Sequence, residues 1–385
     1  ARAAAAALGR VSGERGRGDQ HVLEAIAPHL VHRSAHVRGS ALAALGHVAA
    51  RGSAAATGAA DSALDDASPV VRAAALAALA ELTGETDHAI FPGLLACMQD
   101  PSEVVRQSAL EVLDSCWSRD AAAAARGAAA LLEHPDHGAR EAAVRGLVGI
   151  ALGGGDGEVI PQTLSRIDGR APQACDAALS VLSGIGRHGG GDVYRHALSS
   201  VCAELQRKGG DASTCLWLDA VGRVARRGDG DAVAAARSYL GHATWSVRAA
   251  AHRSLGPMVA CDDRGTLAAM AAGLADGNEN VRRAAVEGLS LRPHRGSQAV
   301  IAAVCGLMHR FMEPRKVSAA PRKPARHRNC SVRVAVASKH RQAEAATQVL
   351  RHVIERGDAS AVSAAVACAR HEDVEVRRGA MESLG

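Results

Sequence analysis

The sequence predicts an all-α fold, a right-handed α-α superhelix of about ten to eleven helical hairpins. A short phrase centred on arginine returns every 34 residues, at Arg38, Arg72, Arg106 and Arg140. A fixed period of this length is typical of arrays in which each repeat packs only on its neighbours. Hydrophobic residues make up 48% of the chain but aromatic residues only 2%. A core built from Ala, Val and Leu favours closely packed helices over β-sheets.

The second helix of each repeat is defined by columns counted from the arginine. A small residue three positions later and a leucine seven positions later share one buried helical face. The residue four positions before the arginine is of a type that favours N-caps. The small column is Ala41, Ala75, Ala109, Ala143, Ala251, Ala285 and Ala380, and the leucine column is Leu45, Leu79, Leu113, Leu147, Leu255, Leu289 and Leu384. The cap column is Ser34, Ser68, Ser102, Asp136, Thr244, Asn278 and Asp373. These columns predict second helices that begin near residues 35, 69, 103, 137, 172, 212, 245, 279 and 374.

The first helix of each repeat ends in a turn whose residue, six positions before the arginine, alternates between aspartate and histidine. The members of this turn column are His32, Asp66, Asp100, His134, His242, Asp276 and His371. Other turns carry Gly-Asp, as in Gly155-Asp156 and Gly230-Asp231. There we expect glycine to adopt positive φ after one helix and aspartate to cap the next. The middle repeats drift, because Cys175 and Thr214 take the arginine position.

The register predicts three segments. They are a repeat array over residues 1–311, a basic insertion over 312–330 and further repeats over 331–385. Residues 310–341 carry ten Lys or Arg against one acid, Glu313. Prolines prevent a continuous helix there, so we expect the insertion to be a disordered surface loop. The sequence does not begin with methionine, and we expect the array to continue beyond both ends.

The repeat phrases resemble a known family. The turn from Asp100 to Arg106, followed by Ala109 and Leu113, resembles HEAT repeats. The wording of residues 37–46 and 247–256 is similar to the HEAT-like repeats of phycobilin lyases. This resemblance covers nearly the whole chain. It implies an armadillo-like solenoid with the first helices on the outer, convex layer and the second helices on the inner, concave one.

The resemblance favours a non-enzymatic scaffold or adaptor that binds a protein partner along the concave face. One alternative is a nucleic-acid-associated factor that uses residues 310–341 and unpaired arginines. Another is a phycobilin lyase-like or chaperone role. No catalytic constellation, cofactor or metal site is predicted, since the single His371-Glu372 pair is too little for a metal centre. No stretch is apolar enough to span a membrane, so no membrane partner is predicted.

Two groups of cations are the candidate partner-binding residues. An arginine in the first turn of a helix opposes the helix dipole and needs an acidic partner. We expect Arg72, Arg106 and Arg282, which follow an aspartate, to contact a turn carboxylate. Arginines that follow a histidine should lack a counter-charge and meet an anionic partner: Arg38, Arg140, Arg248 and Arg377. The second group lies in the insertion: Arg315, Lys316, Arg322, Lys323, Arg326 and Arg328.

Charge and cysteine content narrow the setting. The net charge of +5 is too small by itself to indicate nucleic acid binding. The nine cysteines form no CxxC pair, and we expect reduced thiols. Reduced thiols favour an intracellular location, chiefly the cytoplasm, with the nucleus or an organelle as alternatives.

Overall fold

The computed structural model describes residues 18, 20–83, 90–167, 171–207, 209–291, 297–312, 342 and 344–352, with six single positions after them. The chain forms two compact units, residues 1–197 and 198–385. The boundary between the units falls inside helix α12 (Gly191–Gln206). The basic residues 313–341 lie outside the described part.

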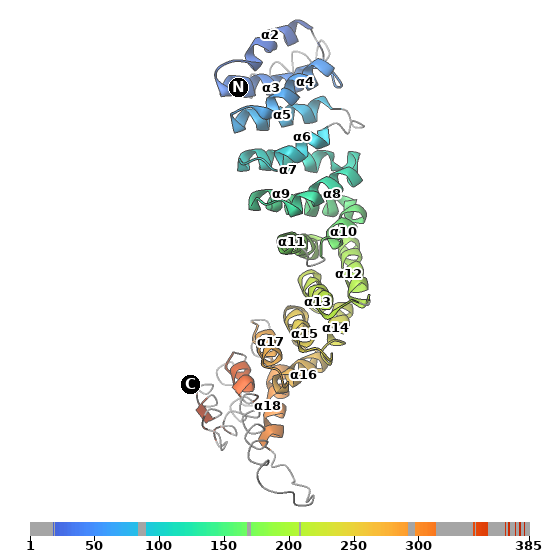
Figure 1. Cartoon of the computed structure of the whole chain (residues 1–385), viewed down its shortest axis with the longest axis vertical. Helices are drawn as coiled ribbons and strands as arrows, with labels where there is room; N and C mark the ends of the chain where they lie inside the picture. The colour runs from blue at the N-terminus through green and yellow to red at the C-terminus, as the bar shows by residue number, and fades with distance from the viewer. Residues whose placement is uncertain are drawn as a thin grey trace, which may run out of the picture. The chain divides into compact units, whose positions relative to one another are not determined.

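The first unit is a stack of helical hairpins (Figure 1). Its first helices are α2 (Gln20–Leu30), α4 (Ala54–Ser62), α6 (Ile90–Cys97), α8 (Ala121–Ala130) and α10 (Asp156–Leu164). Its second helices are α3 (Ala35–Val48), α5 (Pro69–Leu82), α7 (Glu103–Cys116), α9 (His137–Ile150) and α11 (Pro172–His188). Each second helix packs on the second helix of the next hairpin, so the two kinds of helix form two layers.

The second unit repeats the same pattern. Its first helices after α12 are α14 (Gly230–Arg237), α16 (Arg264–Ala272) and α18 (Gln298–Met312). Its second helices are α13 (Asp211–Val224), α15 (Trp245–Met258) and α17 (Glu279–Leu289). Short 3₁₀ turns extend α4, α7, α8 and α16, and a π-helical turn at Ala151–Gly155 joins α9 to α10. The described residues contain no β-strand, and the predicted all-α solenoid of helical hairpins is confirmed.

The predicted columns place the second helices well. Eight of the nine predicted starts agree with the structure to within one residue, and the ninth, near 374, lies outside the described ranges. The small and leucine columns are buried from Ala41 to Leu289, with no member more than 7% exposed. Ala380 and Leu384 lie outside the described residues. The core therefore follows the alternation of one small and one large side chain.

The predicted helix caps need a correction. Ser34, Ser68, Ser102 and Thr244 stand at N-cap positions, but their side chains accept no bond from the helix. Their own amides donate to the turn residue two positions earlier. Examples are Ser68 N to Oδ1 of Asp66 at 2.8 Å and Ser34 N to Nδ1 of His32 at 3.1 Å. This explains the alternating column, because aspartate and histidine both carry an acceptor at the δ1 position.

Glycine connects neighbouring repeats at the opposite end of the second helices. Gly18, Gly52 and Gly228 have φ of 100°, 79° and 82°, in the left-handed region that favours glycine. Their amides donate to the last turn of a neighbouring second helix: Gly18 to Val48 O at 2.9 Å, Gly52 to Leu82 O at 2.8 Å and Gly228 to Met258 O at 2.8 Å.

The Gly-Asp turns were therefore predicted one or two residues away from the true positions. Gly154 and Gly228 take positive φ, whereas Gly155 does not and Gly230 begins α14. The side chain that caps α14 is Asp229, whose Oδ1 accepts from Ala232 N at 3.1 Å.

Candidate partner-binding surface

Each arginine of the repeat phrase first ties down its own turn. Nη1 of Arg72 donates to the carbonyl oxygens of Asp66 at 2.7 Å and Ala67 at 3.3 Å. Arg38, Arg106, Arg140, Arg248 and Arg282 make the same pair of bonds to the residues six and five positions before them. The guanidinium therefore satisfies carbonyl groups that the helical hairpin leaves exposed between its helices.

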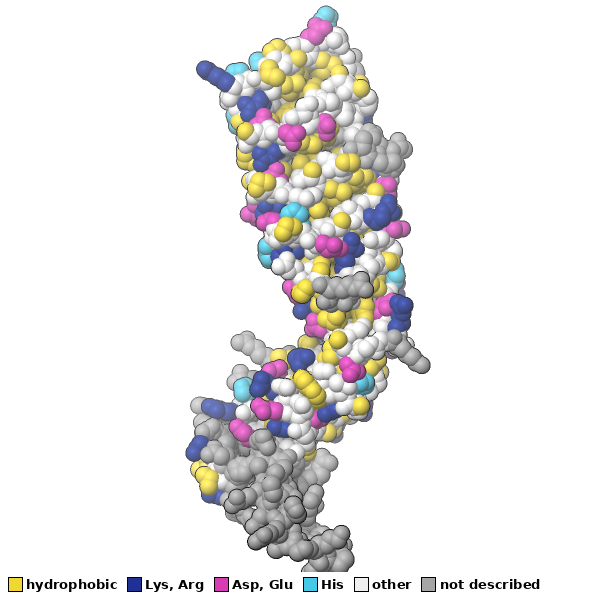
Figure 2. All heavy atoms as spheres, in the orientation of Figure 1, with side chains coloured by type: hydrophobic (Ala, Val, Ile, Leu, Met, Phe, Trp, Pro, Cys, Tyr) yellow, Lys and Arg dark blue, Asp and Glu magenta, His cyan; other side chains and the backbone are white. Residues whose placement is uncertain are grey.

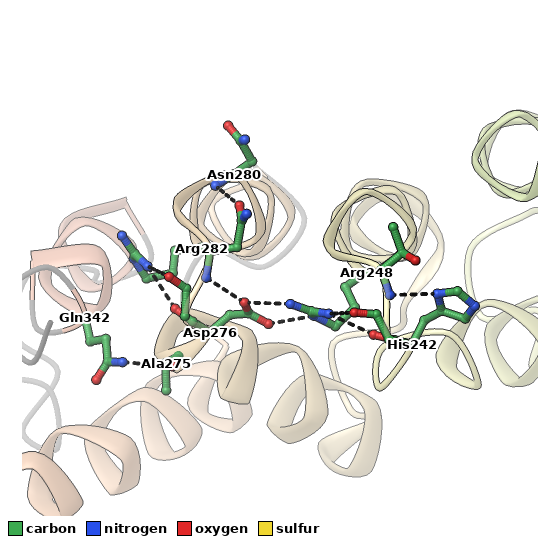
Figure 3. A network of polar contacts seen from close by, with 11 residues as sticks. His242, Arg248, Ala275, Asp276, Asn280, Arg282 and Gln342 are labelled. Carbon is green, nitrogen blue, oxygen red and sulfur yellow. Dashed lines mark hydrogen bonds and ion pairs between the residues drawn. The ribbon is translucent and has the colours of Figure 1, made fainter. Parts of the chain in front are cut away.

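The other edge of the guanidinium reaches the next repeat. Arg72 donates from Nε to Oδ2 of Asp100 at 2.6 Å and from Nη2 to Oδ1 at 2.8 Å. Arg38 makes the same two-bond contact with Asp66, and Arg248 with Asp276 (Figure 3). In each case the acid lies 28 residues after the arginine. We call this contact the arginine clip, since one side chain holds two turns together.

The clips are electrostatically strong for surface pairs. The hydrogen bond from Arg38 holds the pKa of Asp66 below its ordinary value. For Asp100 and Asp276, burial tends to raise the pKa, but the bonds from Arg72 and Arg248 outweigh it and the pKa is lowered. A lowered folded-state pKa stabilises the fold above the ordinary carboxyl pKa. That contribution is lost as the pH falls through the folded value.

Two of the arginines expected to lack a counter-charge do not lack one. Arg38 and Arg248 follow His32 and His242, yet both are clipped to an aspartate. The expectation was wrong because the acid comes from the following repeat and not from the turn before the arginine. The expected carboxylate contact of Arg72 is confirmed. A role of Arg38 and Arg248 in partner binding stays a prediction, without the free charge that motivated it.

The ladder of clips breaks at Arg106. The residue 28 positions later is His134, and Nε of Arg106 is buried without a hydrogen-bond partner. The expected carboxylate contact of Arg106 was therefore wrong. Some counter-charge comes from Asp136, whose pKa is lowered first by the amide of Ala139 and then by the charge of Arg106. His134 itself accepts from Asp136 N at 3.1 Å.

The other histidines of the turn column follow from the same register. Residues 28 positions before His32, His242 and His371 are Ala4, Thr214 and Ala343, which carry no cation to clip. Aspartate is thus used where the preceding repeat supplies an arginine, and Arg106 followed by His134 is the exception.

The remaining candidate arginines are not clipped within the described part of the chain. Arg140 donates to the carbonyl oxygens of His134 and Pro135, both at 2.7 Å, and the residue 28 positions on, Asp168, lies outside the described residues. Arg282 donates to the carbonyls of Asp276 and Gly277, so its expected bond to a carboxylate is not among the described contacts. Arg377 lies partly exposed at a helical position. The six insertion residues, from Arg315 to Arg328, lie outside the described ranges.

Two adjoining hollows cross the exposed face of the second helices in the first unit. One, of about 310 Å³, lies between α7 and α9 and is lined by Leu110, Glu111, Asp114, Trp117 and Arg145, among others. The next, of about 530 Å³, is lined by residues of α7, α9 and α11, including Arg140, Glu141, Arg145 and Asp176. No residue of a first helix lines either hollow. We call this surface over α7, α9 and α11 the second-helix groove.

The groove carries more acids than bases. Its carboxylates are Glu103, Glu111, Asp114, Glu141 and Asp176, and its basic residues are His137, Arg140 and Arg145. Nη1 of Arg145 donates to Oε1 of Gln107 at 3.2 Å. Figure 2 shows acidic and basic side chains alternating down the side of the first unit on which α3, α5, α7 and α9 lie.

Sequence reasoning missed the groove acids. The signal was present one and five positions after the repeat arginine, where Gln107, Glu111, Glu141 and Arg145 replace the Ala73 and Ala77 of the preceding repeat. Exposed alanines serve the helix alone, whereas exposed charged groups can recognise a partner. The change from alanine to charged residues marks where the array becomes specific.

Comparison with known proteins supports the repeat assignment. A family model described as a HEAT-like repeat matches residues 2–48, and a HEAT repeat model matches residues 90–119. The second match comprises α6, α7 and the turn after them. The predicted resemblance to HEAT repeats is therefore confirmed at these segments. No curated protein sequence matches the chain.

Solved structures similar to the chain are also repeat arrays at low identity. An engineered protein matches with 14% identity and a TM-score of 0.31, over 94% of this chain and 97% of its own. Kap95p, studied with RanGDP, matches with 13% identity and a TM-score of 0.43, over 94% of this chain and 50% of its own. Kap121p bound to Nup53p matches with 14% identity and a TM-score of 0.47, over 93% and 40%. The chain thus spans half or less of the two Kap proteins.

Other kinds of site were sought within the described residues. No group of three or more His, Cys, Asp or Glu side chains there has the arrangement of a metal site. None of the described helices combines the length and the apolar character that a membrane span needs. The seven described cysteines are free thiols, three of them buried.

Proposed function

We propose that the chain is a non-enzymatic scaffold that binds a protein partner along the face of its second helices. The supporting observation is the second-helix groove, which crosses three successive repeats without a residue from a first helix. A surface of this length suits an extended segment of another protein, because each repeat presents the same positions at a regular interval. The intracellular, cytoplasmic location inferred from the cysteines belongs to the same proposal.

Site-specific photo-crosslinking in cells tests the proposal. A photoreactive amino acid is placed in the groove, at Gln107 or Gln173, and on the first-helix layer, at Arg126 or Glu158. All four residues are exposed. We expect the two groove positions to give the same protein adduct, and the two first-helix positions to lack it.

Two outcomes would contradict the proposal. Absence of a protein adduct at both groove positions would mean that this face is not an interface. The same adduct at all four positions would show collision without a defined surface. The nucleic-acid alternative rests on residues 310–341, nearly all of which lie outside the described part, and it stays a prediction.

A further inference from the structure

We propose that the second-helix groove binds a basic segment of the partner, one that presents lysine or arginine side chains to α7 and α9. This inference rests on the proposed scaffold function and adds the chemistry of what is bound. It comes from the sign of the groove charge, the state of its carboxylates and the apolar surface beside them.

The groove has the opposite sign to the chain. Five carboxylates face two arginines and one histidine in its lining, whereas the whole chain has a net charge of +5. A hollow lined mainly by one sign of charge concentrates ligands of the opposite sign. A polyanion such as RNA would meet repulsion here, so this surface favours a cationic polypeptide.

Three of the carboxylates are not neutralised within the described structure. Glu103, Glu111 and Asp114 are exposed and make no ion pair with any described residue. The neighbouring cations have other bonds, since Arg145 donates to Gln107 and Arg140 donates to its own turn. The groove acids are therefore open to a cation from outside.

Asp114 occupies a position that its own helix disfavours. It lies in the last turn of α7, which carries no basic residue. A carboxylate at a helix C-terminus meets the negative end of the helix dipole. A lysine or arginine of a partner would offset both the carboxylate and the exposed carbonyl groups of that turn. Asp114 is thus better explained by recognition than by stability of α7.

An apolar surface adjoins these acids. Leu110, Trp117 and Ile150 line the same hollow as Glu111 and Asp114. The Trp117 ring lies so close to Gly153 and Gly155 that a side chain at either glycine would displace it. The ring is therefore held in place by the turn of the next repeat. Long basic side chains combine an apolar stem with a charged end, and arginine also stacks on aromatic rings.

A matched pair of double variants tests the proposal. The groove variant is Glu111→Gln with Asp114→Asn. The control is Asp61→Asn with Asp65→Asn, which makes the same charge change at exposed positions of α4 and the turn after it. The probe is a short labelled peptide that alternates arginine and serine, with a glutamate-serine peptide as its counterpart, and binding is measured by fluorescence anisotropy at low salt.

We expect the groove variant to bind the arginine peptide about tenfold more weakly, as two lost charge contacts predict. The control should differ from the natural chain by less than about twofold, and the glutamate peptide should not bind. Equal weakening in both variants, or none in the groove variant, would overturn the proposal. So would an RNA oligonucleotide that binds the natural chain and loses affinity in the groove variant.

The result also separates this proposal from the scaffold function. If the arginine peptide ignores the groove variant while crosslinking at Gln107 persists, the scaffold stands and the basic partner is wrong. If crosslinking at Gln107 also fails, the groove is not a binding surface at all. Circular dichroism of both variants checks that each remains folded.

Discussion

The gap in the clip ladder can be filled by one substitution, His134→Asp. The new carboxylate stands 28 residues after Arg106, as Asp66, Asp100 and Asp276 stand after their arginines. It keeps the turn, because aspartate in this column accepts the amide two positions on at 2.8 Å, where His134 accepts it at 3.1 Å. It also gives the buried Nε of Arg106 an acceptor.

The size of the gain follows from the existing clips. Their two bonds span 2.6–3.0 Å, and their side chains are 10–19% exposed, which is intermediate between a surface and a buried pair. Charged hydrogen bonds stabilise by about 1.5–3 kcal/mol and exposed ion pairs by about 0–1 kcal/mol. Asp136 lies close by and repels a second carboxylate. We therefore expect about 1–2 kcal/mol of additional stability.

Native-state hydrogen exchange of α7 and α9 is the appropriate assay, since repeats open locally. The matched control is His242→Asp, whose partner position 28 residues earlier is Thr214 and carries no charge. His134→Asp should slow exchange in α7 and α9, while His242→Asp should leave α13 and α15 unchanged. Equal effects of the two substitutions, or faster exchange in His134→Asp, would refute the clip as the reason for the aspartate column.

Further predictions concern the same framework. Asp100→His should leave Arg72 without its acid and destabilise the fold by about 1–2 kcal/mol, as measured by urea unfolding. Leu113→Ala should cost about 2–5 kcal/mol, with exchange rising first in the adjoining repeats; uniform loss along the array would contradict this. Burial lowers the pKa of His252 to about 4, so the unfolded chain binds more protons below pH 6.5 and stability falls as the pH decreases. Between pH 7.5 and 5.5 the loss should be about 1.4 kcal/mol, and a His252→Leu variant should not show it. Deletion of residues 313–328 should abolish salt-sensitive RNA binding if the insertion binds RNA, and the intact chain should show no such binding if it does not.

The elements of the fold were predictable because their causes are local. The small and leucine columns, such as Ala109 and Leu113, report the buried helical face directly, and the eight described starts of second helices follow from them. The caps were less predictable. A serine such as Ser68 can accept from the helix or donate its own amide to Asp66, and the sequence does not distinguish these bonds. Only the position of the helix end follows from either reading.

The candidate site was only partly predictable, because its contacts join different repeats. An acid six residues before an arginine is as near in sequence as in the turn, so Asp66 was assigned to Arg72 and not to Arg38. Only the packing of one hairpin on the next places Asp66 against Arg38. The groove had the same difficulty, because Glu111 and Arg145 belong to different helices and their common hollow arises only when α7 and α9 pack together.

The forward reach of the arginine clip gives the array a direction, and that direction bears on how such a chain can grow. A block from Asp66 to Gln99 contains the acid that receives the preceding arginine and the arginine that reaches the following acid. A second copy of the block inserted in tandem would therefore leave every arginine matched, at both new junctions. A block that starts at His134 has no such property, since its first turn cannot receive an arginine. Tandem duplication is thus compatible with some registers of this sequence and not with others, and the turn column records which ones.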